Sequence, residues 1–320
     1  MNYELLIIPL AYILDLVFGD PQWHWHPVRL IGRLIERLEN KLNTDKMNKI
    51  FCGAVLVILV VGSTVFGVGG MLRLARLIHP FLFYIVSTLL IYFSLSIRSL
   101  AVEAVKIYKN LKSGDIQKAR DNLSLIVGRD TKKLNEQEII RATVEAVAES
   151  TMDGIIAPLF YAFLGGPVIV WVYKAINTLD SMVGYRNERF KEFGYVSAKL
   201  DGLLNFIPSK ITCFLISVSI LCCGKRWFNS LKESGRYLLN GPGVNSDAVE
   251  AAMAGGLGVQ LGGTNFYNSV AVDKLFIGQA AEPLDIKHIR QSVMIAYVSS
   301  VLMLIIGVIV LIVKTRGRFS

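Results

Sequence analysis

The sequence predicts an all-α, polytopic membrane protein with about five transmembrane helices, in a range of about four to six. Hydrophobic residues make up 53% of the 320 residues and charged residues only 18%, whereas about a quarter of a soluble domain is charged. Four runs of 20 to 23 residues carry no charge, namely 50–72, 77–97, 154–173 and 291–313. Each is long enough to cross a bilayer core, which excludes disordered chains, disulfide-rich secreted folds and ordinary cytosolic enzymes.

Six apolar segments follow in order, at 5–18, 50–72, 77–97, 154–176, 202–224 and 291–313, in a single domain over 1–320. The first is short and carries Asp15, and 202–224 carries Lys210. An ionisable residue inside a membrane is a functional hypothesis by default, although a side chain near a segment end can reach the interface. The first segment decides between five and six crossings.

Loop charges give an orientation. The loops 19–49, 98–153 and 225–290 hold 23 of the 34 Lys and Arg residues and are predicted to be cytoplasmic. The net charge of +9 is therefore read as attraction to anionic lipid, with no nucleic-acid partner. The four cysteines form no C-x-x-C pair, so neither a zinc site nor a disulfide framework is supported. The N-terminus lacks the basic region of a cleaved signal peptide.

Helices are expected in the 98–153 loop. Apolar residues recur at helical spacing over 102–111 and Gly114 ends that run, while Gly128 is expected to cap a second helix. Asn135 and Glu138 have the spacing of a capping box. Alternation of period two is almost absent along the chain, which favours helices throughout.

Four charged residues, Arg141, Glu145, Glu149 and Asp153, are spaced by four and would form one stripe on a helix. One interpretation is a solvated helix face with an Arg–Glu pair. The other is a magnesium site, because carboxylates late in a helix oppose its dipole unless a cation is bound. Both interpretations stay open from spacing alone.

Other polar residues stand at predicted membrane boundaries. Arg129 could hold a phosphate or carboxylate, or belong to a capped helix and charged loop. Asn177 and Asp180 share a helical face, where interfacial anchoring is the alternative to function. Asp201 and Asn205 lie at the start of an apolar segment, where they are costly without partners.

Two further motifs are weaker. Asp20 and the nearby His24 and His26 lack a third ligand, so a metal site there is not favoured. Five glycines lie within 255–263, but neither the spacing nor a preceding strand supports a nucleotide-binding P-loop. Close helix packing and a backbone anion nest are the two interpretations of these glycines.

Together these segments resemble the CobD/CbiB family, the adenosylcobinamide-phosphate synthases of cobalamin biosynthesis. The resemblance covers roughly residues 10–285, and the run Asn177–Tyr185 is its most specific part. The matching pieces are Leu14–Asp15, Gly19–Pro21, His26–Val28, Ile126–Thr131, Val147–Glu149, Asp153–Gly154, Ala157–Phe160, Asn177–Asn187, Ala251–Gly255 and Leu257–Gly263.

The resemblance implies an amide-forming ligase in the cytoplasmic membrane. It would join adenosylcobyric acid to aminopropanol or its O-phosphate, with ATP and Mg²⁺ as co-substrate and ion and with cobalt present only inside the corrinoid. Other enzymes of the pathway are possible partners. The alternative is a transporter of an organic anion, but such proteins usually contain two related halves and none is seen here.

The resemblance also suggests roles for individual residues. Glu149 and Asp153 would hold magnesium, and Glu149 would thereby act in catalysis. Asp180 or Asp201 would act as the base toward the amine. The substrate and its phosphate would be bound by Arg129, Asn122, Asn177, Tyr185, Asn205, His26 and Asp20.

The residues 174–210 pose a conflict. The charge count places these residues outside the cell. The motif Asn177–Tyr185 should nevertheless lie next to the motifs of the predicted cytoplasmic loops. Gly165, Gly166 and Pro167 interrupt the preceding segment, and Pro208 lies in the next. Broken segments are tolerated where they line a protein cavity. We therefore expect 155–176 and 203–223 to form a polar pocket open to the cytoplasm.

Overall fold

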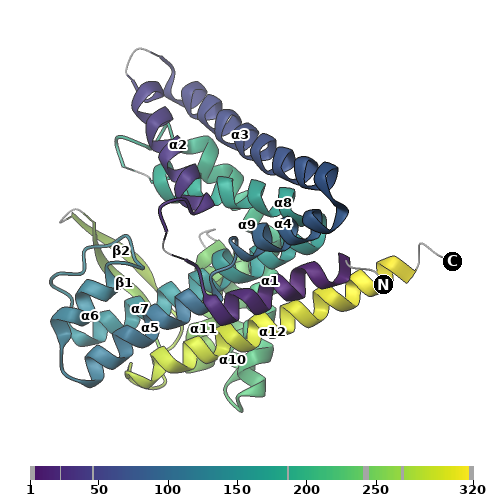
Figure 1. The fold of residues 1–320 in the computed structure, drawn as a ribbon. Helices are drawn as coiled ribbons and strands as arrows, with labels where there is room; N and C mark the ends of the chain where they lie inside the picture. Colours follow the sequence, from purple (N-terminus) through teal and green to yellow (C-terminus); the bar gives the residue numbers. More distant parts are fainter. Residues whose placement is uncertain are drawn as a thin grey trace. The chain divides into compact units, whose positions relative to one another are not determined.

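The computed structural model describes residues 4–21, 23–44, 47–185, 187–240, 245–267 and 270–316. These residues form the helices α1 to α12, a π-helical turn η1 and a two-stranded sheet (Figure 1). The chain divides into two compact units. The first unit draws on residues 1–96, 157–206 and 304–320, and the second on residues 97–156 and 207–303.

Helices α1 (Glu4–Phe18), α2 (Pro27–Leu42), α3 (Lys49–Ile78), α4 (Pro80–Tyr92) and α8 (Ala157–Val183) belong to the first unit. The chain turns sharply between α3 and α4 (Figure 1), where the His79 side chain caps α4 by accepting a hydrogen bond from the Phe81 amide at 3.1 Å. Helix α8 packs on α2, α3 and α4. The indole of Trp171 in α8 donates to the Leu90 carbonyl of α4 at 2.9 Å, which fixes the rotation of α8 against its neighbour.

A break interrupts α8 as predicted. Gly165 and Gly166 have non-helical backbone angles, and Gly166 has a φ of 69° that favours glycine. Pro167 follows and cannot donate a helical hydrogen bond to the preceding turn. By contrast, α9 (Tyr195–Cys222) continues as one helix through Pro208. The break expected at Pro208 does not occur in this helix.

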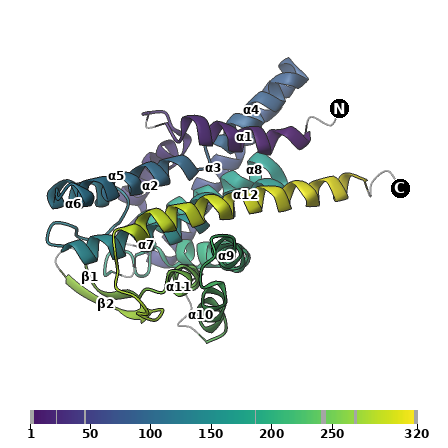
Figure 2. The ribbon, with the colours of Figure 1, turned by 90° about the horizontal axis from the view of Figure 1, so that it is seen from below.

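The second unit consists of helices that pack on one another and on a small sheet. They are α5 (Ile97–Lys112), α6 (Ile116–Leu123), α7 (Glu136–Thr151), η1 (Met152–Ile156), α10 (Trp227–Asn240) and α11 (Asn245–Leu257). Helix α10 packs along α11 (Figure 2). A side chain at Gly255 would lie 2.6 Å from the Asn229 carbonyl of α10, so this glycine permits the close approach. Of the two interpretations of the glycine cluster, close packing is confirmed at Gly255.

The strands β1 (Leu261–Tyr267) and β2 (Val270–Ile277) pair antiparallel, and α12 (Lys287–Arg316) follows them. This hairpin is the main departure from the expectation of helices throughout. Its alternation is weak because three successive residues at the start of β1, Leu261 to Gly263, are buried and β2 is exposed along most of its length. Gly262 and Gly263 have φ values of 79° and 85°, which allow the irregular register at the start of β1.

The predicted helix signals in the 98–153 loop had mixed outcomes. Helix α5 ends just before Gly114, which has a φ of 77°, as predicted. The capping box of Asn135 and Glu138 is confirmed at the start of α7. Gly128 is not a cap, because α6 ends at Leu123 and Ser124 closes it. The segment from Ser124 to Thr131 is a run of turns that carries Arg129 back toward α7.

Within the described part of the chain, five helical stretches are long and apolar enough to cross a membrane: Lys49–Ile78, Pro80–Lys112, Glu136–Val183, Tyr195–Cys222 and Lys287–Thr315. Leu5–Phe18 is apolar but shorter. Large apolar side chains project outward from α3, including Phe66 at 84% exposure, as expected of a surface that contacts lipid. The protein is thus an all-α multi-pass membrane protein.

Candidate functional site

A buried ion pair lies at the centre of the second unit. Glu145 of α7 is 2% exposed, and its Oε2 accepts a hydrogen bond from Nη2 of Arg129 at 2.6 Å. Its Oε1 accepts one from the Gly262 amide at 2.8 Å. Nη1 of Arg129 donates to Oδ1 of Asn265 in β1, also at 2.6 Å. One guanidinium therefore joins α7 to β1, and the solvated-face interpretation is wrong for Glu145.

Arg141 supplies a second link between α7 and β1. Its guanidinium donates to the carbonyls of Gly262 and Thr264, the latter at 3.0 Å, and its Nε lies 3.9 Å from Oε1 of Glu145. The predicted Arg–Glu pair of the stripe therefore forms, but inside the protein. The hydrogen bonds of Arg141 hold the start of β1, which contains Gly262 and Gly263, beside α7.

A carboxyl group of α11 lies in this region and was missed by the sequence analysis. Glu250 is 2% exposed, and burial raises its pKa well above the ordinary value, with a further raising effect from Glu145, Glu149 and Asp247. Lys274 of β2 opposes that shift. The signal was available, because Glu250 is the one acid inside the small-residue run 248–257, where the described residues are all buried.

The acids and Lys274 are electrostatically linked. Burial lowers the pKa of Lys274, but Glu250, Tyr267, Asp247 and Glu149 raise it and the net shift is upward. Burial also raises the pKa of Asp247. The second unit therefore holds several acids around one lysine, beside the Arg129–Glu145 pair.

The two proposed magnesium ligands lie where α7 gives way to η1. Glu149 is exposed in the last turn of α7, and Asp153 is half-buried in the π-helical turn. No cluster of three or more His, Cys, Asp or Glu side chains suited to a metal occurs among the described residues. Two hard carboxylate groups completed by substrate phosphate oxygens are nevertheless an ordinary magnesium environment. The magnesium assignment stays a prediction.

A second polar network lies in the first unit, between α8 and α9. Asp201 accepts hydrogen bonds from the side-chain amides of Asn177 at 3.3 Å and Asn205 at 3.0 Å. The Tyr173 hydroxyl donates to Oδ1 of Asn205 at 3.1 Å. The structure thus brings together three of the predicted site residues, Asn177, Asp201 and Asn205. They come from the two segments in which polar residues had been noted at predicted membrane boundaries. The carboxylate of Asp201 is held in one orientation by two amide donors.

A small polar cavity of about 180 Å³ opens in the same unit. Its lining includes Asp20, His26, Arg29 and Lys174. Oδ1 of Asp20 lies 2.8 Å from Nε2 of His26, and the His26 side chain is 4% exposed. The Tyr92 hydroxyl donates to the Gly19 carbonyl at 2.5 Å, which anchors the turn that carries Asp20. The cavity combines one carboxylate with three basic groups.

Two basic side chains bring α8 and the segment after it close to the 19–49 loop. Two of the three guanidinium nitrogens of Arg189, Nε and Nη2, donate to Oε1 of Glu39 in α2, at 3.2 and 2.9 Å. Lys174 lines one cavity with Asp20 and His26. Groups in direct contact at the ends of membrane segments lie on one side of the membrane. A shared side of the membrane for residues 187–194 and the 19–49 loop is therefore favoured and stays a prediction.

The remaining predicted residues lie at element ends. Asp180 lies near the end of α8, and a side chain at Gly184 would overlap its carboxylate, which explains the glycine of this motif. Tyr185 is exposed just beyond α8, and Arg186 lies outside the described residues. Asn122 is half-buried in the last turn of α6, in the second unit.

The chain is similar to proteins of one family along nearly its whole length. The family model described as "CobD/Cbib protein" matches residues 8–296. A protein of Clostridium perfringens named "Cobalamin biosynthesis protein CobD" is 42% identical over 95% of this chain and 96% of its own length. A protein of that name from Geobacter metallireducens is 42% identical over 97% of both chains.

A third relative, "Cobalamin biosynthesis protein CbiB" of Salmonella typhimurium, is 41% identical over 92% of this chain and 93% of its own length. No solved structure matches the chain. The match covers both units and all of the polar networks described above. The chain belongs to the CobD/CbiB family of cobalamin biosynthesis proteins.

Proposed function

We propose that this protein is the membrane-bound synthase that forms the amide between adenosylcobyric acid and aminopropanol or its O-phosphate, at the expense of ATP. Family membership supports the pathway, and the charged cavity of the first unit is the observation that carries the substrate assignment. A free carboxylate does not condense with an amine in water without activation, so ATP supplies the driving force. One carboxyl oxygen leaves on the phosphate or AMP released from ATP, and the ammonium group of the amine gives up two protons as the amide forms.

The amine substrate suits the cavity of about 180 Å³. Aminopropanol phosphate is a small zwitterion, with an ammonium group at one end and a phosphate at the other. Asp20 would attract the ammonium group as the substrate enters, before that group reaches the base, while Arg29 and Lys174 would receive the phosphate. His26 holds Asp20 at 2.8 Å and so sets the direction of its carboxylate.

The base that frees the amine is assigned to Asp201, with Asp180 as the second candidate. Two amide donors orient the Asp201 carboxylate, and a carboxylate can accept further hydrogen bonds through its remaining lone pairs. Asn177 and Asn205 therefore act as positioning residues for this carboxylate. Amine nucleophiles need their proton removed as the bond forms, which is the chemistry that a held carboxylate provides.

The second unit would supply the phosphate chemistry. Glu149 and Asp153 would hold Mg²⁺, which when bound neutralises charge on the phosphates of ATP. Arg129 has two nitrogens already engaged by Glu145 and Asn265, so its remaining donors would be the ones that reach a phosphate. Asn122 and Tyr185 keep their assignment as substrate-binding residues.

Kinetics with two amines tests the substrate assignment. We expect Lys174→Gln to raise the KM for aminopropanol phosphate at least tenfold and to leave the KM for unphosphorylated aminopropanol nearly unchanged. Lys191→Gln, which removes an exposed lysine of the same stretch, is the matched control. An equal change in the KM of both amines would show that Lys174 does not bind the phosphate.

The base is identified by comparing Asp201→Asn with Asp180→Asn. The variant of the true base should keep its affinity for corrinoid and lose at least a hundredfold in kcat, as expected for loss of general base catalysis. Asp121→Asn, an exposed position on α6, is the control. Normal kcat in both variants would exclude both aspartates from the proton transfer.

A further inference from the structure

A second, larger cavity lies in the second unit, where two membrane-spanning helices meet the water boundary. It measures about 610 Å³ and lies at the end of α9 and the start of α12, facing α5. Lys225, Lys287 and Arg290 contribute positive charge to its lining, and no acidic side chain is among the described lining residues. The remaining wall is mainly apolar, with Val105, Val293 and Met294.

Three basic side chains line this cavity, and they differ in how far their charge is already used. The guanidinium of Arg290 lies 5.5 Å from the centre of the Tyr108 ring, a contact that holds the group without using its hydrogen-bond donors. Nζ of Lys225 donates to Gln291 at 2.8 Å and keeps two further donors. Lys287 is partly neutralised by Glu282 at 2.9 Å. Arg290 and Lys225 therefore provide most of the attraction for an anion.

Aromatic side chains indicate the depth of the cavity. Trp227 and Phe228 follow Lys225 closely and are 42% and 63% exposed at the start of α10. Exposed Trp next to basic residues at the end of a spanning helix is typical of the lipid headgroup level. This pattern is the one expected if Lys225 lies at the level of the lipid phosphates.

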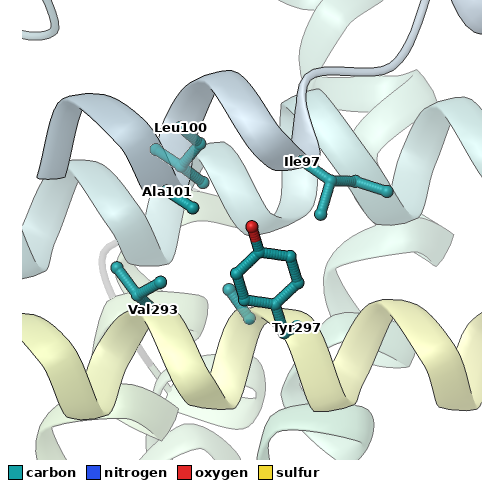
Figure 3. A pocket seen from close by; sticks show the side chains of 6 residues that line it. Ile97, Leu100, Ala101, Val293 and Tyr297 are labelled. Atoms are coloured by element: carbon teal, nitrogen blue, oxygen red, sulfur yellow. The ribbon is translucent and has the colours of Figure 1, made fainter. Parts of the chain in front are cut away.

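The apolar wall continues toward the membrane interior along α12. Met294 lines the cavity, and Val301 lies two turns further on the same face. Both are exposed, at 57% and 43%. A narrow gap between α5 and α12 shares Val293 and Tyr297 with this cavity. Figure 3 shows Tyr297 directing its ring from α12 toward Ile97 and Ala101 of α5, where no room for a water molecule remains.

We propose that this cavity binds an anionic phospholipid, with its phosphate on Arg290 and Lys225 and an acyl chain along Met294 and Val301. The combination of basic side chains next to exposed Trp227 and an exposed apolar face along α12 matches the two ends of a lipid. A free phosphate or a nucleotide would find no use for the apolar face. This inference does not depend on the proposed reaction.

The test is lipid retention by the full-length protein. Protein is purified from bilayer discs of phosphatidylcholine and phosphatidylglycerol in equal parts, and retained lipid is measured by native mass spectrometry. Wild type should retain phosphatidylglycerol in preference to phosphatidylcholine. Arg290→Gln and Lys225→Gln should each weaken retention about fivefold, because a basic residue at an anionic membrane contributes about 1 kcal/mol.

The control is Lys232→Gln, which removes an exposed positive charge of α10 that does not line the cavity. It should leave retention unchanged. An equal loss in this control would show diffuse charge attraction and overturn the site. Equal retention of both lipids by wild type would overturn it as well.

Soluble anions distinguish a lipid site from a phosphate or nucleotide site. Inorganic phosphate and ADP are each added to the detergent-solubilised protein while its thermal stability is followed. A stabilisation by either that disappears in Arg290→Gln would assign the cavity to a soluble anion and overturn the lipid proposal. Should Arg290→Gln fail to fold, Lys225→Gln alone decides, since it leaves the contact of Arg290 with Tyr108 in place.

Discussion

Breaking the buried pair of Arg129 and Glu145 should destabilise the second unit severely. Glu145→Leu would leave the guanidinium of Arg129 without its 2.6 Å partner and the Gly262 amide without its acceptor. Loss of one partner from a buried ion pair typically costs about 3–5 kcal/mol. The same reasoning applies to Arg129→Met, which strands the Glu145 carboxylate at 2% exposure.

The double variant provides the sharper test. Replacing both members by apolar residues removes the stranded charge, so Arg129→Met combined with Glu145→Leu should be more stable than either single variant. Some loss should remain, because the Gly262 amide loses its acceptor, and an unsatisfied buried donor costs about 1–3 kcal/mol. The coupling between the two sites should therefore be large and favourable.

The assay is the fraction of detergent-solubilised protein that stays monodisperse after heating, measured across a temperature series. Glu136→Leu is the matched control, because Glu136 is exposed in the first turn of the same helix. It should change stability by less than about 0.5 kcal/mol. Single variants as stable as this control, or a double variant at the sum of the two losses, would refute the reasoning.

Three other variants or labels probe the acids and the topology. Glu149→Gln should fold normally, lose activity by orders of magnitude and recover part of it at high magnesium, as turnover against magnesium would show; unchanged turnover would return this residue to a solvated role. The raised pKa of Glu250 means that the folded state favours its protonated form, so stability falls as the pH rises from the ordinary glutamate pKa toward the raised one. Glu250→Gln should flatten that fall in a series of melting curves, and an identical pH profile would contradict the assignment. Single cysteines at Glu36 and Glu188, with the four native cysteines replaced by serine, should react with a membrane-impermeant thiol reagent from the same side.

The membrane helices were predictable because the bilayer imposes a length and an apolar composition that a single sequence reveals. The break at Gly165 and Gly166 was also predictable, since glycine and proline act locally. The hairpin of β1 and β2 was not, because β2 is exposed along most of its length and has no buried face to impose alternation. The helix α6 ends at Leu123 with Ser124 as its cap. Serine is a weaker signal for a helix end than glycine, so the cap was assigned to Gly128 instead.

The candidate site was partly predictable. Asn177, Asp201 and Asn205 stood out as polar groups in apolar segments, and the structure joins them in one network. The pairing of Arg129 with Glu145 could not be read from spacing, because the turns after α6 decide where Arg129 returns. Glu250 was overlooked because it stands alone among small, apolar neighbours and belongs to no regularly spaced set of acids. Its isolation within that run was the available signal.

The most direct measurement of the central claim follows one oxygen atom. Cobyric acid carrying isotopically heavy oxygen in its free carboxyl group is incubated with the purified protein, aminopropanol phosphate, ATP and Mg²⁺ in detergent. The proposed reaction predicts cobinamide phosphate that has lost one heavy oxygen, with that oxygen recovered in the phosphate or AMP released from ATP. Intact cobyric acid, or amide formed with no heavy oxygen in the ATP products, would contradict an ATP-driven amide synthase.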